Sequence, residues 1–92
     1  MAEVHHENVF FSGRVQGVGF RYLTSQVASE FEVAGVVANL ADGRVHLEVE
    51  GRPDQVNAFI AAIEQRMHGY IRKIERNSDR RTPQFSGFSI RP

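Results

Sequence analysis

The sequence predicts an α+β fold in which an antiparallel sheet carries two helices on one face. Apolar, β-branched runs alternate with segments of helical periodicity in the order β-α-β-β-α-β, and a short extra strand follows. This order is typical of an antiparallel sheet with its helices packed on a single side. A chain of 92 residues, of which 41% are hydrophobic, supplies one modest core. We therefore expect a single domain over residues 1–92, with a flexible N-terminus over residues 1–7.

The first strand and the first helix flank a glycine-rich turn. An apolar run predicts the strand over residues 9–15. A helix is expected over residues 21–32 because apolar side chains recur there every three or four positions. These side chains are Phe20, Leu23, Val27 and Phe31.

A hairpin and a second helix form the middle of the chain. Residues 33–40 and 44–51 predict two strands joined at Asp42-Gly43, a dipeptide that favours tight hairpins. The second strand alternates apolar and polar side chains, so one of its faces is expected to be buried. A helix is expected over residues 53–67, with Pro53 at its first position. Its apolar stripe consists of Val56, Phe59, Ile60, Ile63 and Met67.

The last third of the chain predicts two strands separated by a loop. Residues 71–76 are expected to form the first of these strands. Residues 77–83 are polar and basic, which is typical of a loop. Residues 85–91 predict the short extra strand at the end of the chain.

Composition limits the classes of function. Eleven Lys and Arg residues balance eleven Asp and Glu residues, so no broad basic field attracts nucleic acid, and any anion must be recognised locally. The absence of cysteine excludes disulfides, thiolate metal sites and a cysteine nucleophile. Residues 1–8 are polar, and no apolar run is long enough to span a membrane. We therefore expect a cytoplasmic monomer with no nucleic-acid or membrane partner.

Gly13, Gly17 and Gly19 mark the turn between the first strand and the first helix. Glycine adopts positive φ and lets backbone N–H groups approach a ligand closely. The start of the following helix adds N–H donors and partial positive charge, which favour an anion. Arg21 lies in the first helical turn, where the helix dipole disfavours a cation by about 0.3–1 kcal/mol. A bound phosphate would explain this arginine because the guanidinium would hold the same oxyanion.

Two better-known phosphate motifs do not fit this turn. A P-loop that begins at Gly13 would need glycine at Val18, followed by lysine. A dinucleotide fingerprint that begins at Gly17 would need a third glycine at Tyr22. The structural alternative is a plain glycine-rich turn followed by a solvated arginine at a helix start.

Asn39, at the end of a predicted strand, is the second polar candidate. Its carboxamide offers both an acceptor and donors, which suits holding a water without removing its proton. An asparagine two residues before Ala41-Asp42 suits turn chemistry equally well.

Histidine and serine offer weaker candidates. The four histidines, which lack metal-ligand spacing on a common face, are expected to be solvated; they are His5, His6, His46 and His68. Ser12 and Ser25 have no identifiable base, so a covalent serine intermediate is not expected.

Two segments together resemble the signatures of the acylphosphatase family. The first is Gly13-Arg14-Val15-Gln16-Gly17-Val18-Gly19-Phe20-Arg21, and the second is Gly35-Val36-Val37-Ala38-Asn39. The resemblance covers about residues 9–90. It implies a ferredoxin-like sandwich, which agrees with the predicted order of elements.

The resemblance also implies roles for individual residues. Arg21 would bind the phosphate and Asn39 would orient the attacking water. The backbone amides that would bind the phosphate beside Arg21 are those of Gln16, Gly17, Val18, Gly19 and Phe20. The second signature departs from the family pattern at Val36 and Ala38, where an aromatic and a basic or polar residue are usual. We expect these changes to affect substrate affinity and local packing more than the reaction.

A further departure is Glu32, where family members usually have a glycine that ends the first helix. A left-handed conformation at Glu32 would cost about 1–2 kcal/mol, so a different helix end is expected.

The residues and the resemblance together predict a hydrolase of small acyl phosphates that yields a carboxylate and inorganic phosphate. Because the first signature contains no carboxylate, we expect no metal and no cofactor, with Arg21 neutralising the phosphoryl charge. The alternative is a non-catalytic anion- or nucleotide-binding module, since ferredoxin-like folds host many functions. An RNA-binding sheet surface is disfavoured because its aromatic signature is missing.

Overall fold

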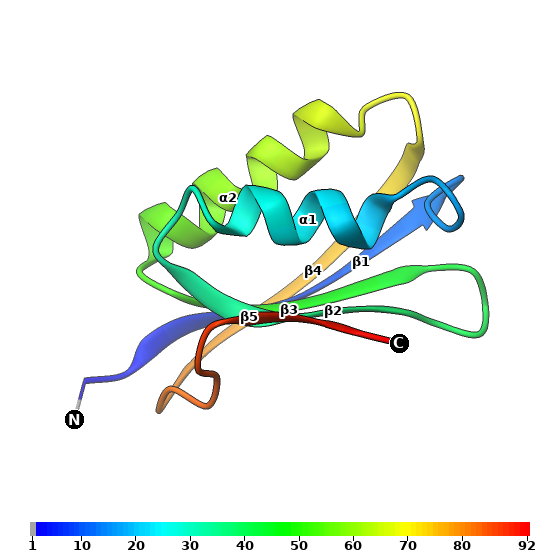
Figure 1. The fold of residues 1–92 in the computed structure, drawn as a ribbon. Helices are drawn as coiled ribbons and strands as arrows, with labels where there is room; N and C mark the ends of the chain where they lie inside the picture. The colour runs from blue at the N-terminus through cyan, green and yellow to red at the C-terminus, as the bar shows by residue number, and fades with distance from the viewer. Residues whose placement is uncertain (1) are drawn as a thin grey trace.

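Residues 2–92 are described by the structure, a computed structural model, and they form five strands and two helices (Figure 1). In chain order these are β1 (Val4–Gly13), α1 (Phe20–Ala28), β2 (Val33–Asn39), β3 (Val45–Gly51), α2 (Pro53–Arg66), β4 (Ile71–Arg81) and β5 (Phe88–Arg91). The strands form one sheet in the order β4-β1-β3-β2-β5, and both helices cover the same face (Figure 1). The predicted α+β architecture is confirmed.

An apolar core fills the space between the sheet and the helices. Its largest fully buried side chains include Phe11 of β1, Phe20 of α1, Leu47 of β3 and Phe59 of α2. The rings of Phe11 and Phe20 pack with their centroids 5.0 Å apart. This contact fixes the start of α1 against the end of β1, the two elements that the glycine-rich turn connects.

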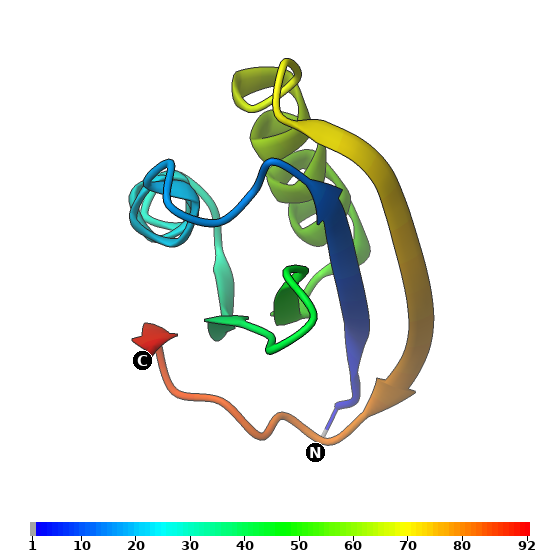
Figure 2. The ribbon, with the colours of Figure 1, turned by 90° about the vertical axis from the view of Figure 1, so that its right-hand side faces the viewer.

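One strand of the sheet runs in a direction that the sequence analysis did not predict. β1, β2, β3 and β4 pair antiparallel as expected, whereas β5 pairs with β2 in parallel. β4 ends at the same end of the sheet at which β2 begins. The chain then crosses beneath the sheet, so β5 enters beside the start of β2 and follows its direction (Figure 2).

Three predicted boundaries of β1 and β4 are wrong. β1 begins at Val4, within the segment expected to be a flexible N-terminus, because it pairs with both β3 and β4. Met1, also part of that prediction, lies outside the described residues. β4 continues to Arg81 through most of the predicted loop, because its backbone follows β1 in register, with Asn8 opposite Asn77. At its other end β1 stops at Gly13, two residues before the predicted end.

Helix α1 ends four residues earlier than predicted. Its last residue is Ala28, and Ser29 closes it in a right-handed conformation. Among residues 2–92, positive φ is confined to glycine, so Glu32 avoids the left-handed conformation. The Glu32 backbone N–H donates instead to Oε1 of Gln55 on α2, at 2.9 Å.

A loop of residues 82–87, the crossover loop, spans the sheet face opposite the helices (Figure 2). The carboxylate of Glu50, only 3% exposed, accepts backbone N–H groups of Gln84 and Phe85, each at 2.9 Å. Arg81 lies 3.3 Å from the same carboxylate. Glu50 therefore anchors the loop that delivers β5 to the far edge.

The same face holds a histidine that the sequence analysis expected to be solvated. His6 is 4% exposed, with Nδ1 2.6 Å from Asp79 and Nε2 2.9 Å from Glu48. That expectation is wrong for His6 because β3 and β4 bring both carboxylates to the imidazole from either side of β1.

Candidate active site

The turn between β1 and α1 is shaped by glycine at two kinds of position. Gly13 sits at a bulge of β1, where a Cβ would lie 2.3 Å from the carbonyl oxygen of Tyr70. Gly17 and Gly19 both have φ of +78°, and Gly19 is the N-cap of α1. The positive φ values predicted for these glycines are confirmed.

The start of α1 leaves its backbone donors free of side-chain caps. No side chain of residues 2–92 caps the N-terminus of the helix, and its first turn contains no acidic residue. The backbone N–H of Leu23 donates to the Gly19 carbonyl at 3.0 Å, which marks the first full turn. The N–H groups of the residues before Leu23 therefore retain donor capacity toward a ligand.

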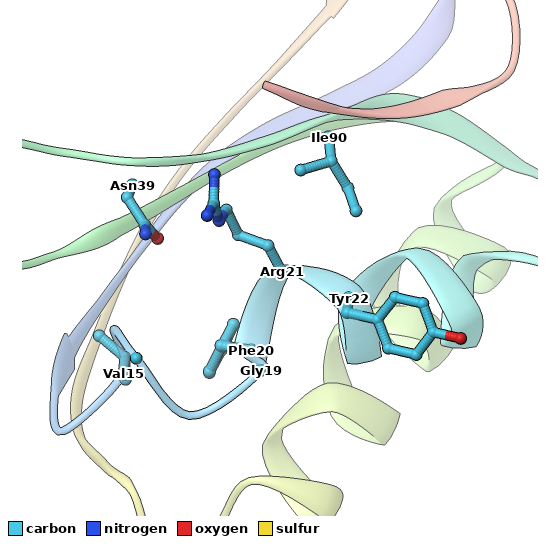
Figure 3. Close-up of a pocket in the computed structure, with 8 residues that line it drawn as sticks. Val15, Gly19, Phe20, Arg21, Tyr22, Asn39 and Ile90 are labelled. Atoms are coloured by element: carbon cyan, nitrogen blue, oxygen red, sulfur yellow. The ribbon is translucent and has the colours of Figure 1, made fainter. Parts of the chain in front are cut away.

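A pocket of about 220 Å³ lies against this turn (Figure 3). It is smaller than the roughly 300–1,000 Å³ typical of drug-sized ligand sites, so it suits a small ligand. It is bordered by backbone of the turn and by side chains from α1, β2 and β5. The residues are Val15, Gly17, Gly19, Phe20, Arg21, Tyr22, Asn39 and Ile90.

Arg21 points from the first turn of α1 into this pocket (Figure 3). Its Nη1 donates to the carbonyl oxygen of Arg91, on β5, at 2.8 Å. A guanidinium has five N–H donors, so this contact orients the group and leaves most donors available for an anion.

Asn39, the last residue of β2, faces the guanidinium of Arg21 across the pocket (Figure 3). Its Oδ1 is buried and has no hydrogen-bond partner among the described residues. A buried polar atom without a partner costs about 1–3 kcal/mol, so such atoms often mark functional positions. Within residues 2–92, Oδ1 of Asn39 therefore makes no hydrogen bond of the kind by which an asparagine side chain stabilises a turn.

Gln16 lies beside the pocket, and its side chain has a role that the sequence did not reveal. Its Nε2 donates to the carbonyl oxygens of Leu40 and Arg44, at 2.8 and 3.0 Å. These two residues flank the turn between β2 and β3. The carboxamide thus ties the glycine-rich turn to the strand end that carries Asn39.

The predicted site residues fall into two groups. Gly17, Gly19, Phe20, Arg21 and Asn39 come together around the pocket. Gln16 and Val18 are not among its lining residues, and the Val18 side chain packs against the core. Any contact of these two with a ligand in the pocket would come from their backbone.

Sequence reasoning missed three lining residues, Val15, Tyr22 and Ile90. Val15 and Tyr22 are neighbours in the chain of predicted site residues, and this proximity could have indicated their place at the pocket. Nothing in the sequence near Ile90 indicates its place there, because only the pairing of β5 with β2 brings it to the pocket.

The other polar candidates form no second centre. No group of three His, Asp or Glu side chains among residues 2–92 is arranged so that it could hold a metal ion. His46 stacks on Phe10 with ring centroids 4.6 Å apart, and its Nε2 lies 2.8 Å from Oδ1 of Asn8. The pKa of His46 is lowered, chiefly by burial. The charge of Glu48 raises this pKa, and the charges of Arg91, Arg44 and His6 lower it further. Nor does the described chain contain a helix that is long and apolar enough to cross a membrane.

Comparison with known proteins agrees with this geometry. The acylphosphatase family model matches residues 7–90. An acylphosphatase of Methanospirillum hungatei JF-1 is 37% identical over 83 residues, which cover 90% of this chain and 89% of that protein. An acylphosphatase of Lacticaseibacillus paracasei is 30% identical over 91% of this chain and 92% of its own length. The crystal structure of acylphosphatase from Bacillus subtilis has a TM-score of 0.86 at 30% identity, covering 96% of this chain and 99% of that one. The chain therefore belongs to the acylphosphatase family.

Proposed function

We propose that this protein hydrolyses small acyl phosphates, with Arg21 and the backbone of the glycine-rich turn holding the phosphoryl group and Asn39 orienting the water. The water oxygen bonds to phosphorus and the bond from phosphorus to the acyl oxygen breaks. An acyl phosphate dianion and water thus give a carboxylate and dihydrogen phosphate. Such a transfer depends on positioning and charge stabilisation rather than on covalent catalysis.

One observation carries the proposal: Arg21 of α1 and Asn39 of β2 meet in one pocket against the glycine-rich turn. The cation offsets the phosphoryl charge that would repel a nucleophile. The carboxamide of Asn39, whose buried Oδ1 has no partner within the described chain, supplies the unused hydrogen-bonding capacity that would orient a water. The non-catalytic binding module is not favoured, because the relatives at comparable length are acylphosphatases.

The departures from the second signature lie away from this pocket. Val37 is buried in the core on the helix side of β2, so its neighbours Val36 and Ala38 face the opposite side of the sheet. Val36 and Ala38 are 7% and 8% exposed. We infer that these substitutions change packing on that face rather than the reaction.

The decisive experiment is phosphate release from benzoyl phosphate by the wild type and by Arg21→Ala. We expect the variant to lose at least about 10³-fold in kcat/KM, as for other arginines that stabilise phosphoryl transfer. Arg80→Ala, which removes an arginine that is 63% exposed on β4, is the matched control and should retain wild-type activity. If Arg21→Ala keeps more than a tenth of the rate, Arg21 is not the clamp.

A metal-free reaction is part of the proposal. The residues assigned to the phosphoryl group supply N–H donors and a guanidinium, with no carboxylate to hold a divalent cation. Activity should therefore survive an excess of chelator. Loss of activity that added magnesium restores would contradict this mechanism.

Three expectations from the sequence belong to the same proposal. They are a single domain over residues 1–92, a cytoplasmic monomer, and no nucleic-acid partner. The zero net charge supports the last of these.

A further inference from the structure

Exposed apolar side chains gather at the pocket. The large hydrophobic residues most exposed in the described chain are Tyr22, Tyr70 and Ile90, at 66%, 41% and 41%. Tyr22 and Ile90 both line the pocket, whereas Tyr70 does not. Two unrelated elements, α1 and β5, therefore expose apolar surface at the same place.

Each of the two residues has one structural relation that bears on its direction. The hydroxyl of Tyr22 accepts a hydrogen bond from Nε2 of Gln26, one helical turn away, at 2.8 Å. Ile90 lies opposite Val37 in the parallel pairing of β5 with β2, which directs it to the helix side of the sheet. The two residues, one from α1 and one from β5, give this border of the pocket an apolar surface, the Tyr22–Ile90 wall.

In Figure 3, Ile90 and Tyr22 lie on the other side of the Arg21 guanidinium from Asn39, and the Tyr22 ring extends away from the guanidinium. Phosphoryl transfer proceeds with the attacking and leaving oxygens roughly in line across phosphorus. If water is bound at Asn39 and phosphorus at Arg21, the leaving acyl group extends toward the far side. That side is the Tyr22–Ile90 wall.

The charges at the pocket add a second constraint. Among its lining residues, Arg21 alone is charged, and the proposed function commits that charge to the phosphoryl group. A second negative charge on the acyl group would lose hydration beside apolar side chains and gain no cation in return.

We propose that Tyr22 and Ile90 form an acyl-group subsite that selects uncharged, apolar acyl chains. This inference rests on the proposed function and names the substrate class of the same site. Tyr22 and Ile90 act as specificity-determining residues, because they contact the leaving group rather than the reacting phosphorus.

A series of acyl phosphates tests the preference of the wild type. The series runs from acetyl through butyryl to hexanoyl phosphate, with succinyl phosphate as the charged counterpart of the butyryl compound. Each fully buried methylene is worth about fourfold in affinity, so a half-open pocket should give about twofold per methylene in kcat/KM. Succinyl phosphate should be at least about tenfold poorer than butyryl phosphate, since an unpaired charge beside apolar surface is costly.

Variants assign the preference to the wall. Tyr22→Ser and Ile90→Ser should each flatten the dependence on chain length, lowering kcat/KM for hexanoyl phosphate far more than for acetyl phosphate. Inorganic phosphate should inhibit both variants at about the wild-type concentration, because the phosphoryl contacts lie elsewhere. Tyr70→Ser is the matched control, and it should keep the full dependence on chain length.

The possible outcomes separate this inference from the function on which it rests. Failure of the wild type to hydrolyse any member of the series would overturn the proposed function. Hydrolysis at rates independent of chain length, or an unchanged dependence in both wall variants, would overturn the subsite and leave the function in place. A wild-type preference for succinyl over butyryl phosphate would also overturn it.

Discussion

At the scale of single residues, three polar side chains in or beside the pocket differ in their hydrogen-bond partners. Arg21 is oriented by a backbone carbonyl of β5, and Gln16 by two carbonyls at the β2–β3 turn. Asn39 has an unpartnered Oδ1 among residues 2–92. Backbone carbonyls therefore hold Arg21 and Gln16 in place, while Asn39 keeps Oδ1, and Arg21 its remaining N–H donors, available for chemistry.

Replacement of Asn39 by alanine should impair catalysis without harming the fold. Loss of one preorganised polar group typically costs about 10²–10³ in kcat, and we expect a loss of that size for Asn39→Ala. Because Oδ1 makes no hydrogen bond within the described chain, the free energy of unfolding should change by less than about 1 kcal/mol. Steady-state kinetics measure kcat, inhibition by phosphate measures phosphate affinity, and thermal unfolding measures stability.

Asn77→Ala, on the exposed part of β4, is the control for this substitution and should behave as wild type. An equal loss of kcat and of phosphate affinity in Asn39→Ala would make Asn39 a binding residue instead.

Replacement of Gln16 by glutamate should separate the glycine-rich turn from Asn39. A carboxylate cannot donate to the carbonyl oxygens of Leu40 and Arg44, and it repels both. Displacement of a bound substrate by about 1 Å can cost about 10²-fold, so we expect kcat/KM to fall by at least about tenfold. Gln65→Glu, an equal charge change on the exposed side of α2, should leave kcat/KM unchanged.

A double-mutant cycle distinguishes positioning from general damage. If Gln16 acts by placing the turn relative to Asn39, its effect should shrink in an Asn39→Ala background. Fully additive losses would show that Gln16 acts independently of Asn39.

At the scale of elements, hydrophobic periodicity predicted the order of strands and helices. The features that it did not predict depend on pairing between segments that are distant in the sequence. The stripes of both helices and the alternation in β3 depend on burial against one core, which leaves a local signature in the sequence. Residues 77–81 have no such signature, because β4 is an edge strand held by β1 through its backbone. The early end of α1 and the parallel direction of β5 likewise depend on neighbours that are distant in the sequence.

The candidate site divides in the same way. Arg21 could be predicted because it is a cation in the first turn of a helix, where the helix dipole disfavours one. Asn39 could be predicted because it places a carboxamide at the end of a strand. Ile90 and the side-chain role of Gln16 could not, because both depend on which strands become neighbours. Local chemistry is thus readable from the sequence, while contacts across the sheet are not.

The crossover loop should link stability to activity through Glu50. Glu50→Gln removes the negative charge of a carboxylate that accepts hydrogen bonds from Arg81 and from the backbone N–H groups of Gln84 and Phe85. Hydrogen bonds to charged groups contribute about 1.5–3 kcal/mol each, and part of them survives in glutamine, so we expect a loss of about 2–3 kcal/mol in the free energy of unfolding.

Activity should fall together with stability in Glu50→Gln. The loop leads into β5, which supplies both Ile90 and the carbonyl that orients Arg21. KM for hexanoyl phosphate is therefore expected to rise. Glu75→Gln, which changes an exposed carboxylate on β4, is the matched control. A destabilised variant with wild-type KM would show that β5 keeps its place without this anchor.

At the scale of the whole molecule, acid should destabilise the fold in two steps. Burial lowers the pKa of His46 below its ordinary 6.5, so the unfolded chain takes up this proton first and stability falls as the pH drops below 6.5. Burial raises the pKa of Glu7, but hydrogen bonds from Arg76 and His5 outweigh it and bring the pKa below 4.5. Stability therefore falls again below pH 4.5.

Thermal unfolding between pH 3 and pH 8 measures both steps. His46→Gln should remove the step that begins near pH 6.5 and preserve the lower one, since the variant has no proton to gain there. An identical dependence of Tm on pH in the wild type and in His46→Gln would contradict this assignment of the upper step.

The two borders of the sheet differ in length and charge, and this difference bears on self-association in concentrated solution. Free N–H and C=O groups along an edge strand are a template for another chain, and fibrils grow in this way. β4 is the longer border and carries Arg72, Lys73, Arg76, Arg80 and Arg81. Two copies that approached edge to edge there would repel each other, and added salt would weaken this repulsion. The other border, β5, offers only four residues. Arg80 and Arg81, which make the end of β4 look like a loop in the sequence, are thus among the residues that protect this border from forming intermolecular sheets.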